Sequence, residues 1–265
     1  MIIVGELINA SRKAIREALE KKDRAAIEQV ARDQAAKGAH YIDVNAGVFV
    51  DEEVELLTWL VEVVQGVVEA PCCLDSPNPQ AIEAALKVHR GTAMINSISL
   101  ESQRCEALLP LLAGTDLKVV ALCMSDKGMP ETTEQRLAIA EELVGLLTGK
   151  GVPLGNIYVD PLVQPVSANQ SFGISFLNAV DAIHKRYPEA HFMCGLSNVS
   201  YGLPARSVLN RFFMAMAIAK GLDGAIVNPL DDNMMAAIYS AEALAGRDNY
   251  CLNYIKAFRA KRLGV

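Results

Sequence analysis

Short apolar runs alternate with longer amphipathic stretches along this chain, and the alternation limits its possible folds more than any other feature. Each run is compact and apolar and ends at polar or turn residues, as strands buried on both faces of a parallel sheet do. The runs occupy residues 2–5, 41–45, 72–75, 93–97, 119–124, 157–161, 191–196 and 224–228. Eight buried strands joined by helices are what a (β/α)8 TIM barrel requires.

The stretches between the runs have the spacing of amphipathic helices. Within 52–68, for example, Val54, Leu57 and Val61 recur at helical intervals. The remaining helical patterns cover residues 12–37, 79–88, 100–112, 134–147, 176–186, 207–220 and 234–243. Because no linker or low-complexity tract divides the chain, we expect one α/β domain over residues 1–265. The first run continues as Gly5-Glu6-Leu7-Ile8-Asn9, which lacks the G-x-G-x-x-G turn of a dinucleotide-binding sheet.

Charge and composition exclude several classes of function. Lys and Arg total 25 against 31 Asp and Glu, a formal net charge of −6, so the chain lacks the basic surface that binds nucleic acid or an anionic membrane. No apolar run is long enough to cross a membrane, and the first residues do not read as a secretory leader. The six cysteines have neither metal-binding nor disulfide spacing. We expect a cytoplasmic protein with free thiols and with no nucleic-acid or membrane partner.

Polar side chains follow the predicted strands at their carboxyl ends, the face where barrels of this kind hold their active sites. The residues are Glu6, Asn9, Asp43, Asn45, Asp75, Asn96, Ser125, Asp160, Ser197, Asn198 and Asn228. The set contains no Lys, Arg or His. Carboxylates accept paired N–H donors and carboxamides both donate and accept, so the set suits a neutral ligand such as an aminopyrimidinone ring. A phosphorylated ligand would require cations or a helix N-terminus instead.

Two other interpretations of these residues stay open at this point. Asp43, Asn45, Asp75 and Asp160, taken singly, are each typical of capping or turn residues. The three aspartates together would also offer the oxygen ligands that Mg²⁺ or Mn²⁺ prefers. Because no phosphate-binding signal lies near them, we favour a ligand pocket and expect no bound metal. The four histidines precede strands or lie in helical patterns, so we expect structural roles for them.

Taken in order, six segments at these strand ends resemble the methyltetrahydrofolate:corrinoid protein methyltransferases, a pterin-binding (β/α)8 barrel family. They are Gly5-Glu6-Leu7-Ile8-Asn9, Ile42-Asp43-Val44-Asn45, Leu74-Asp75-Ser76, Met94-Ile95-Asn96-Ser97, Val159-Asp160-Pro161-Leu162 and Gly195-Leu196-Ser197-Asn198-Val199-Ser200. The ordered set spans nearly the whole chain. One departure is Met124-Ser125-Asp126 after the fifth strand, where several relatives carry an Asn near the ring.

The resemblance implies roles for individual residues. Asp75, Asn96 and Asp160 would hold the pyrimidine edge of the pterin, and Asn198 would reach N5 and act in catalysis. Gly195 and Ser197 would line the same pocket. Further pocket residues would be Glu6, Asn9, Asp43, Asn45, Ser97 and Arg206. Arg206 is also a candidate for binding the glutamate tail of folate.

The family transfers a methyl group between N5 of tetrahydrofolate and the cobalt of a corrinoid, in either direction, and implies a homodimer. None of the four histidines lies in a corrinoid-binding D-x-H-x-x-G segment, so the corrinoid would come on a separate protein that docks at the carboxyl-terminal face of the barrel. The alternatives are a dihydropteroate synthase-like pterin enzyme and a non-catalytic folate-binding subunit of a methyltransferase complex. The first is disfavoured because Ser197-Asn198 lacks the cation that a pyrophosphate substrate requires.

Overall fold

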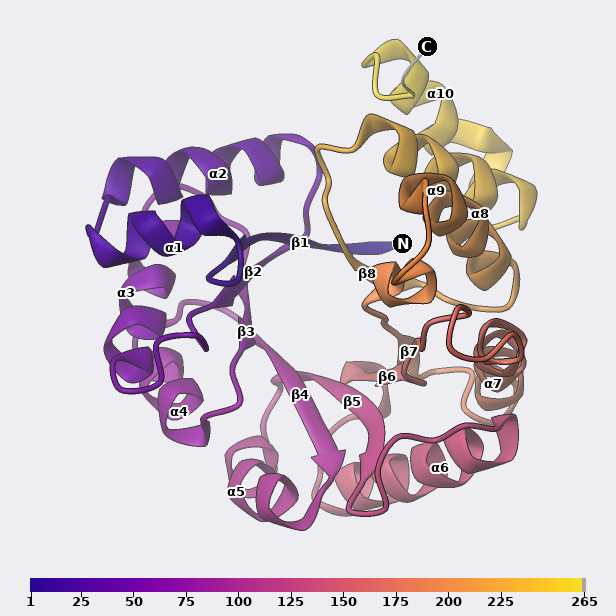
Figure 1. Cartoon of the computed structure of the whole chain (residues 1–265), viewed down its shortest axis with the longest axis horizontal. Helices are drawn as coiled ribbons and strands as arrows, with labels where there is room; N and C mark the ends of the chain where they lie inside the picture. The colour runs from indigo at the N-terminus through magenta and orange to yellow at the C-terminus, as the bar shows by residue number, and fades with distance from the viewer. Residues whose placement is uncertain (264–265) are drawn as a thin grey trace.

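Eight parallel strands form the centre of the computed structural model, which describes residues 1–263. The strands are β1 (Ile2–Asn9), β2 (Tyr41–Asn45), β3 (Cys72–Asp75), β4 (Met94–Leu100), β5 (Lys118–Ser125), β6 (Ile157–Asp160), β7 (His191–Phe192) and β8 (Gly224–Val227). They pair in the order β7-β6-β5-β4-β3-β2-β1-β8. The N–H of Ile226 donates to the carbonyl of Cys194 at 3.2 Å and so joins the two ends of the sheet. The predicted barrel is confirmed, and Figure 1 shows its strands as a ring inside the helices.

Helices follow the strands and cover the outside of the ring. They are α1 (Lys13–Glu20), α2 (Arg24–Ala36), α3 (Glu53–Gln65), α4 (Pro79–Val88), α5 (Ser102–Leu112), α6 (Thr133–Gly149), α7 (Phe172–Arg186), α8 (Arg206–Ala219), α9 (Asp232–Leu244) and α10 (Leu252–Arg259), with 3-10 turns η1 (Leu154–Asn156), η2 (Leu196–Ser200) and η3 (Asn249–Cys251). The prediction of one helix over 12–37 is wrong. Lys22 has a φ of 47°, and Asp23 caps a second helix by accepting the N–H of Ala26 at 3.1 Å.

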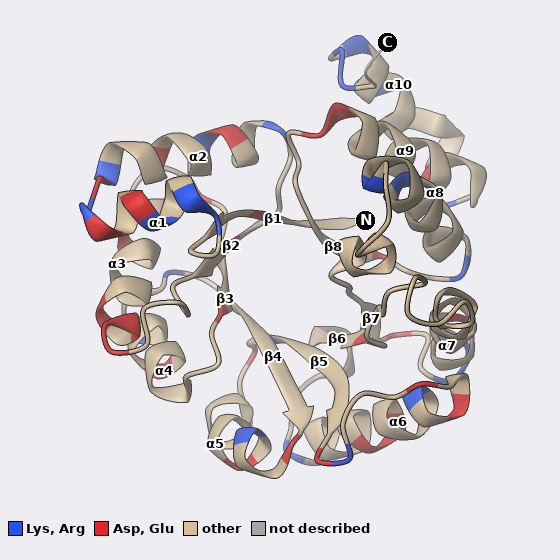
Figure 2. Ribbon diagram, viewed as in Figure 1, with Lys and Arg blue, Asp and Glu red and all other residues tan. Residues whose placement is uncertain are grey.

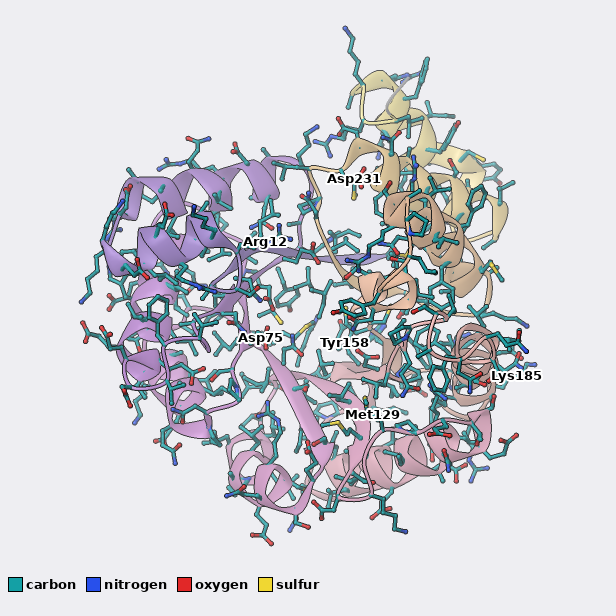
Figure 3. The ribbon with its side chains drawn as sticks, in the orientation of Figure 1. Arg12, Asp75, Met129, Tyr158, Lys185 and Asp231 are labelled. Carbon is teal, nitrogen blue, oxygen red and sulfur yellow. The ribbon has the colours of Figure 1, made fainter. Side chains whose placement is uncertain are left out.

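The side chains that point into the barrel form two layers, because successive residues of a strand face opposite sides. The lower layer is an apolar cluster, separate from the larger core between sheet and helices: Val4, Tyr41, Cys73, Met94, Val120, Tyr158 and Met193. Further along the strands, polar side chains follow toward the carboxyl-terminal ends: Glu6, Asp43, Asp75, Asn96 and Asp160, whereas β5 places the apolar Leu122 two residues after Val120. Figure 3 shows Asp75 and Tyr158 toward the middle of the ring and Lys185 on its outside. A ligand of this barrel therefore lies at its carboxyl-terminal mouth.

Three of the histidines fix the amino ends of strands. His40 Nδ1 accepts the N–H of Ile3 at 3.1 Å, and His89 Nε2 accepts the N–H of Cys72 at 2.9 Å. His191 opens β7 and lies 2.6 Å from a carboxylate oxygen of the segment before β8. Burial lowers the pKa of His40 and of His89, which keeps both rings neutral and able to accept. These contacts bear out the structural roles expected for the three residues.

The surface of the ring is mixed in charge. Figure 2 shows acidic and basic side chains interspersed over the outer helices. Within residues 1–263, no helix combines the length and the hydrophobicity that a membrane crossing requires.

Candidate functional site

The polar residues of β2, β3 and β4 meet at the mouth because their strands are neighbours in register. Asn45, at the end of β2, donates from Nδ2 to Oδ2 of Asp75 at 2.9 Å. Asp75 pairs with Asn96 across β3 and β4, so their side chains share the inner face. The oxygen of the Asn45 amide accepts the N–H of Gly47 at 3.0 Å, which fixes its orientation. Asn45 therefore orients the Asp75 carboxylate beside the Asn96 amide.

Asp43 pairs in register with Cys73, two residues before Asp75, so it lies deeper in the barrel than Asp75, and it is 2% exposed. Its Oδ1 is buried and has no hydrogen-bond partner in the described part of the chain. Burial raises the pKa of Asp43 well above its usual range and the nearby Asp75 carboxylate raises it further, whereas the side chains of Cys73 and Asn96 oppose the rise. The pKa of Asp75 is also raised, mainly by burial. The two carboxyl groups together thus retain a proton more readily than exposed aspartates do.

Asp160, the last residue of β6, is held by the backbone that follows it. Its Oδ1 accepts the N–H of Leu162 at 2.8 Å, in a turn where Leu162 has a φ of 65°. The carboxyl is almost fully buried, and this burial raises its pKa to about 7. The N–H groups of Leu162 and Gly195 and the charge of Arg136 oppose the rise. Asp160 can therefore act as an acceptor when ionised and as a donor when protonated near neutral pH.

Asn198 lies at the rim of the mouth in η2, where its side chain is exposed. Its amide nitrogen lies over Gly195, 3.8 Å from the position that a Cβ of Gly195 would occupy. Since the Gly195 N–H also reaches Asp160, the β7 loop brings the Asn198 amide to the side of the mouth that Asp160 occupies. Ser197, the neighbouring residue, is exposed as well.

Arg206, at the start of α8, fastens this loop. Its Nη2 donates to the carbonyl of Ser197 at 2.6 Å and its Nε donates to Oγ of Ser200 at 3.1 Å. The guanidinium lies 5.9 Å from the ring centre of Tyr201. In this arrangement the Arg206 side chain holds η2 in place, and its role toward a glutamate tail stays a prediction.

The residues of β1 lie between those of β2 and β8 around the mouth. Glu6 pairs with Arg12 at 2.9 Å, and its pKa is raised because burial outweighs the opposing effect of Arg12. Oδ1 of Asn9 accepts the N–H of Ser11 at 3.0 Å, so Asn9 closes the turn into α1. A small pocket of about 90 Å³ lies between Glu6 and Ser197.

Ser125 lies outside this group. Its Oγ accepts the N–H of Lys127 at 3.3 Å. It lines a separate pocket of about 600 Å³ between the β5–α6 loop and α6, with Met129 at its edge (Figure 3).

Two arginines that the sequence patterns do not single out hold the mouth together. Arg104 on α5 donates to the carbonyls of Ser97 at 2.6 Å and Ser76 at 3.0 Å, and so ties β4 to the loop after β3. Arg136 on α6 is 0% exposed and donates to the carbonyl of Pro161 at 2.8 Å. Helical periodicity could have found Arg136, because it begins the buried stripe that continues as Ala140, Leu143, Val144 and Leu147. Arg104 carries no such signal.

The structure brings most of the predicted residues to one mouth: Glu6, Asp43, Asn45, Asp75, Asn96, Ser97, Asp160, Gly195, Ser197 and Asn198. Asn9 and Arg206 instead serve the turns next to it. In residues 1–263 no three His, Cys, Asp or Glu side chains are grouped as metal ligands. The individual binding roles stay predictions.

Known proteins with similar sequences are folate and pterin enzymes. The family model described as "pterin binding enzyme" matches residues 5–228. The whole chain is 36% identical to the methylcorrinoid:tetrahydrofolate methyltransferase of Eubacterium limosum, of which it covers 98%. Over 86% of the chain, it is 31% identical to the methionine synthase of Mycobacterium tuberculosis, of which it spans 20%.

Solved structures of dihydropteroate synthases have the same fold. The enzyme of Coxiella burnetii, in complex with pteroic acid, superposes with a TM-score of 0.70 at 15% identity and covers 92% of this chain and 93% of its own. The enzyme of Xanthomonas albilineans gives a TM-score of 0.66 at 18% identity, with 92% and 90% covered. At these identities the likeness concerns the fold alone.

Proposed function

The chain belongs to the pterin-binding enzymes, and from this premise we propose that it is a methyltransferase that moves a methyl group between N5 of tetrahydrofolate and the cobalt of a corrinoid carried by a second protein. The observation that carries the proposal is the mouth itself: carboxylates and carboxamides from neighbouring strands converge there, and the histidines serve the opposite face. The full-length likeness to a methylcorrinoid:tetrahydrofolate methyltransferase supports this choice among pterin enzymes.

The pterin would bind by its pyrimidine edge, which presents a ring N–H beside an amino group. Asp75, oriented by Asn45, and the ionised form of Asp160 are acceptors for such paired donors. The Asn96 amide beside Asp75 can both donate and accept, so it can match the adjacent ring oxygen. Asp43 beneath them has a buried oxygen without a partner and supports the floor of this pocket.

The chemical demand of the reaction falls on N5. The departing nitrogen is basic, so transfer needs a hydrogen bond to N5 that strengthens as the bond to the methyl carbon breaks. The Asn198 amide, exposed over Gly195, is the group that we assign to this hydrogen bond. A reduced corrinoid is itself a strong nucleophile and needs no base from this chain. In the reverse direction the same residues act, by microscopic reversibility.

The corrinoid protein would dock on the loops around the mouth. Apolar side chains are exposed on four of these loops: Val48 and Val50 after β2, Met129 after β5, Tyr201 after η2 and Leu230 after β8. The exposed fractions of Val50 and Tyr201 reach 76% and 65%. An apolar rim around a polar pocket suits a protein partner that covers the mouth while it presents its cobalt to the bound folate.

A homodimer would use a different surface, the outer face of α8. Phe212 lies three and four residues after Leu209 and Val208, and Met216 lies four residues after Phe212; all four are exposed, and Ile174 on α7 is exposed as well. Such a stripe on a helix is typical of a surface that a second copy covers.

Anaerobic mixing of the protein with methyltetrahydrofolate and Co(I) cobalamin tests the proposed function. We expect the Co(I) absorbance to decay at a rate proportional to the protein concentration. Tight folate binding with a persistent Co(I) band, also when the corrinoid is protein-bound, would contradict catalysis and favour a folate-binding subunit. Condensation of p-aminobenzoate with a pterin pyrophosphate would instead favour the dihydropteroate synthase alternative.

A further inference from the structure

Arg136 carries a positive charge into the interior without a carboxylate to pair with it. The side chain is 0% exposed and forms no ion pair within residues 1–263. Its guanidinium donates only to neutral oxygens: the carbonyls of Thr132 at 3.1 Å, Pro161 at 2.8 Å and Leu162 at 3.4 Å, and Oε1 of Gln164 at 2.7 Å. Burying a charge in this way is costly, so the position requires a benefit that an apolar residue of the α6 stripe would not supply.

Three of the four acceptors belong to the segment that follows Asp160. The peptide N–H of Leu162 donates to Oδ1 of Asp160 at 2.8 Å, while the carbonyls of Pro161 and Leu162 accept from Arg136. The same short turn therefore forms hydrogen bonds with the buried Arg136 through its carbonyls and with the Asp160 carboxylate through its N–H. Arg136 acts on Asp160 through this turn and also through its charge.

The groups that face Asp160 are otherwise neutral. The N–H groups of Leu162 and Gly195 donate to it. The thiols of Cys123 on β5 and Cys194 after β7 lie nearby, and burial raises the pKa of both, so they stay uncharged. Among the described residues, Arg136 is the charged group that acts on Asp160.

We propose that Arg136 is a positioning residue for the pterin-binding carboxylate: it fixes the turn after β6, whose Leu162 N–H donates to Asp160, and its positive charge favours the ionised form of Asp160. The inference rests on the proposed role of Asp160 in accepting the N–H donors of the pterin. An ionised carboxylate accepts two such donors side by side, whereas a protonated one has lost part of this capacity. Arg136 would thereby extend to lower pH the range in which the protein binds folate.

The test is the pH dependence of methyltetrahydrofolate affinity in Arg136→Gln and Arg136→Lys, measured by calorimetry. In the unmodified protein, affinity should fall as the pH drops through the Asp160 pKa of about 7. Arg136→Gln keeps hydrogen-bonding groups but removes the charge, so the midpoint should move to higher pH, with about tenfold weaker binding at acidic pH for each unit of movement. Arg136→Lys keeps the charge but loses the planar fork, so affinity should fall at all pH values with a smaller movement of the midpoint.

Arg247 provides the matched control, because it also donates to backbone carbonyls, those of Leu222 and Ile218, but outside the mouth. Arg247→Gln should lower thermal stability and leave the midpoint in place. An unchanged midpoint in Arg136→Gln would overturn the inference, provided that circular dichroism shows the variant folded over the same pH range. If Arg136→Gln fails to fold, an Arg136→Lys variant with unaltered affinity at every pH would overturn it.

Asp160→Asn separates this inference from the proposed function. Loss of the pH dependence in Asp160→Asn, together with an unmoved midpoint in Arg136→Gln, would reject the role of Arg136 alone. An unaltered affinity and pH profile in Asp160→Asn would reject the role of Asp160 in the pterin site itself.

Discussion

The Asn198 amide is the side-chain group that we assign to the reacting nitrogen of folate. Replacement by Ala removes a hydrogen bond that gains strength as the bond to the methyl group breaks. We expect single-turnover transfer at saturating methyltetrahydrofolate to slow by roughly 100-fold or more, with a much smaller loss of affinity. Stopped-flow measurement of Co(I) absorbance gives the rate, and a rate near that of the unmodified protein would remove Asn198 from the mechanism.

Substitution of Asp75 or Asn96 should weaken folate binding more than it slows methyl transfer, the reverse of the effect expected at Asn198. Alanine at either position leaves donors or acceptors of the bound ring without a partner, which costs about 1–3 kcal/mol of binding free energy. Calorimetry with methyltetrahydrofolate measures this loss, while the transfer rate at saturation should change little. Asn169→Ala is a suitable control, because Asn169 only closes its own loop by accepting the N–H of Ser171 at 2.9 Å. Equal affinity in Asn96→Ala and in this control would show that the pyrimidine edge binds elsewhere.

At the scale of elements, the η2 turn depends on one side chain of the following helix. Arg206→Ala releases the Ser197 carbonyl and the Ser200 hydroxyl, so the turn that carries Asn198 should lose its fixed position and transfer should slow. If Arg206 only tethers the turn, the loss of affinity should be the same for folates with one or several glutamates. If it also binds the tail, the loss should grow with tail length. Calorimetry with both forms decides between the two.

Sequence patterns predicted the strands and helices wherever the hydrophobic pattern of one element continued without interruption. The polar ends of β2, β3 and β6 could be read directly, because each apolar strand stops at the carboxylate or carboxamide that faces the mouth. The expected strand 191–196 is shorter in the structure, since β7 ends at Phe192 and the chain turns into η2. The tethers by Arg104 and Arg206 could not be predicted, because they join residues through loop geometry rather than through periodicity.

At the scale of the whole molecule, we propose that the outer face of α8 forms the contact between two copies of the chain. Phe212 is 70% exposed in the middle of the apolar stripe, so Phe212→Glu should convert the proposed dimer into monomers at micromolar concentration while leaving folate affinity unaltered. Leu244→Glu is the matched control, since Leu244 is 89% exposed at the end of α9, outside the stripe. Sedimentation velocity gives the mass of each variant. A monomeric unmodified protein would reject the proposed dimer.

The apolar layer below the mouth closes the barrel interior on the amino-terminal side. Tyr41, Met94 and Tyr158 fill the interior under the polar residues. Folate can therefore enter and leave only through the carboxyl-terminal mouth. The exposed rim on the same face is where we expect the corrinoid protein to dock. If the corrinoid protein docks on this face as proposed, it covers the opening through which folate passes. Folate would then bind before the partner and leave after it, in either direction of transfer. Excess partner should consequently trap the product and slow repeated turnover, even though it accelerates the first.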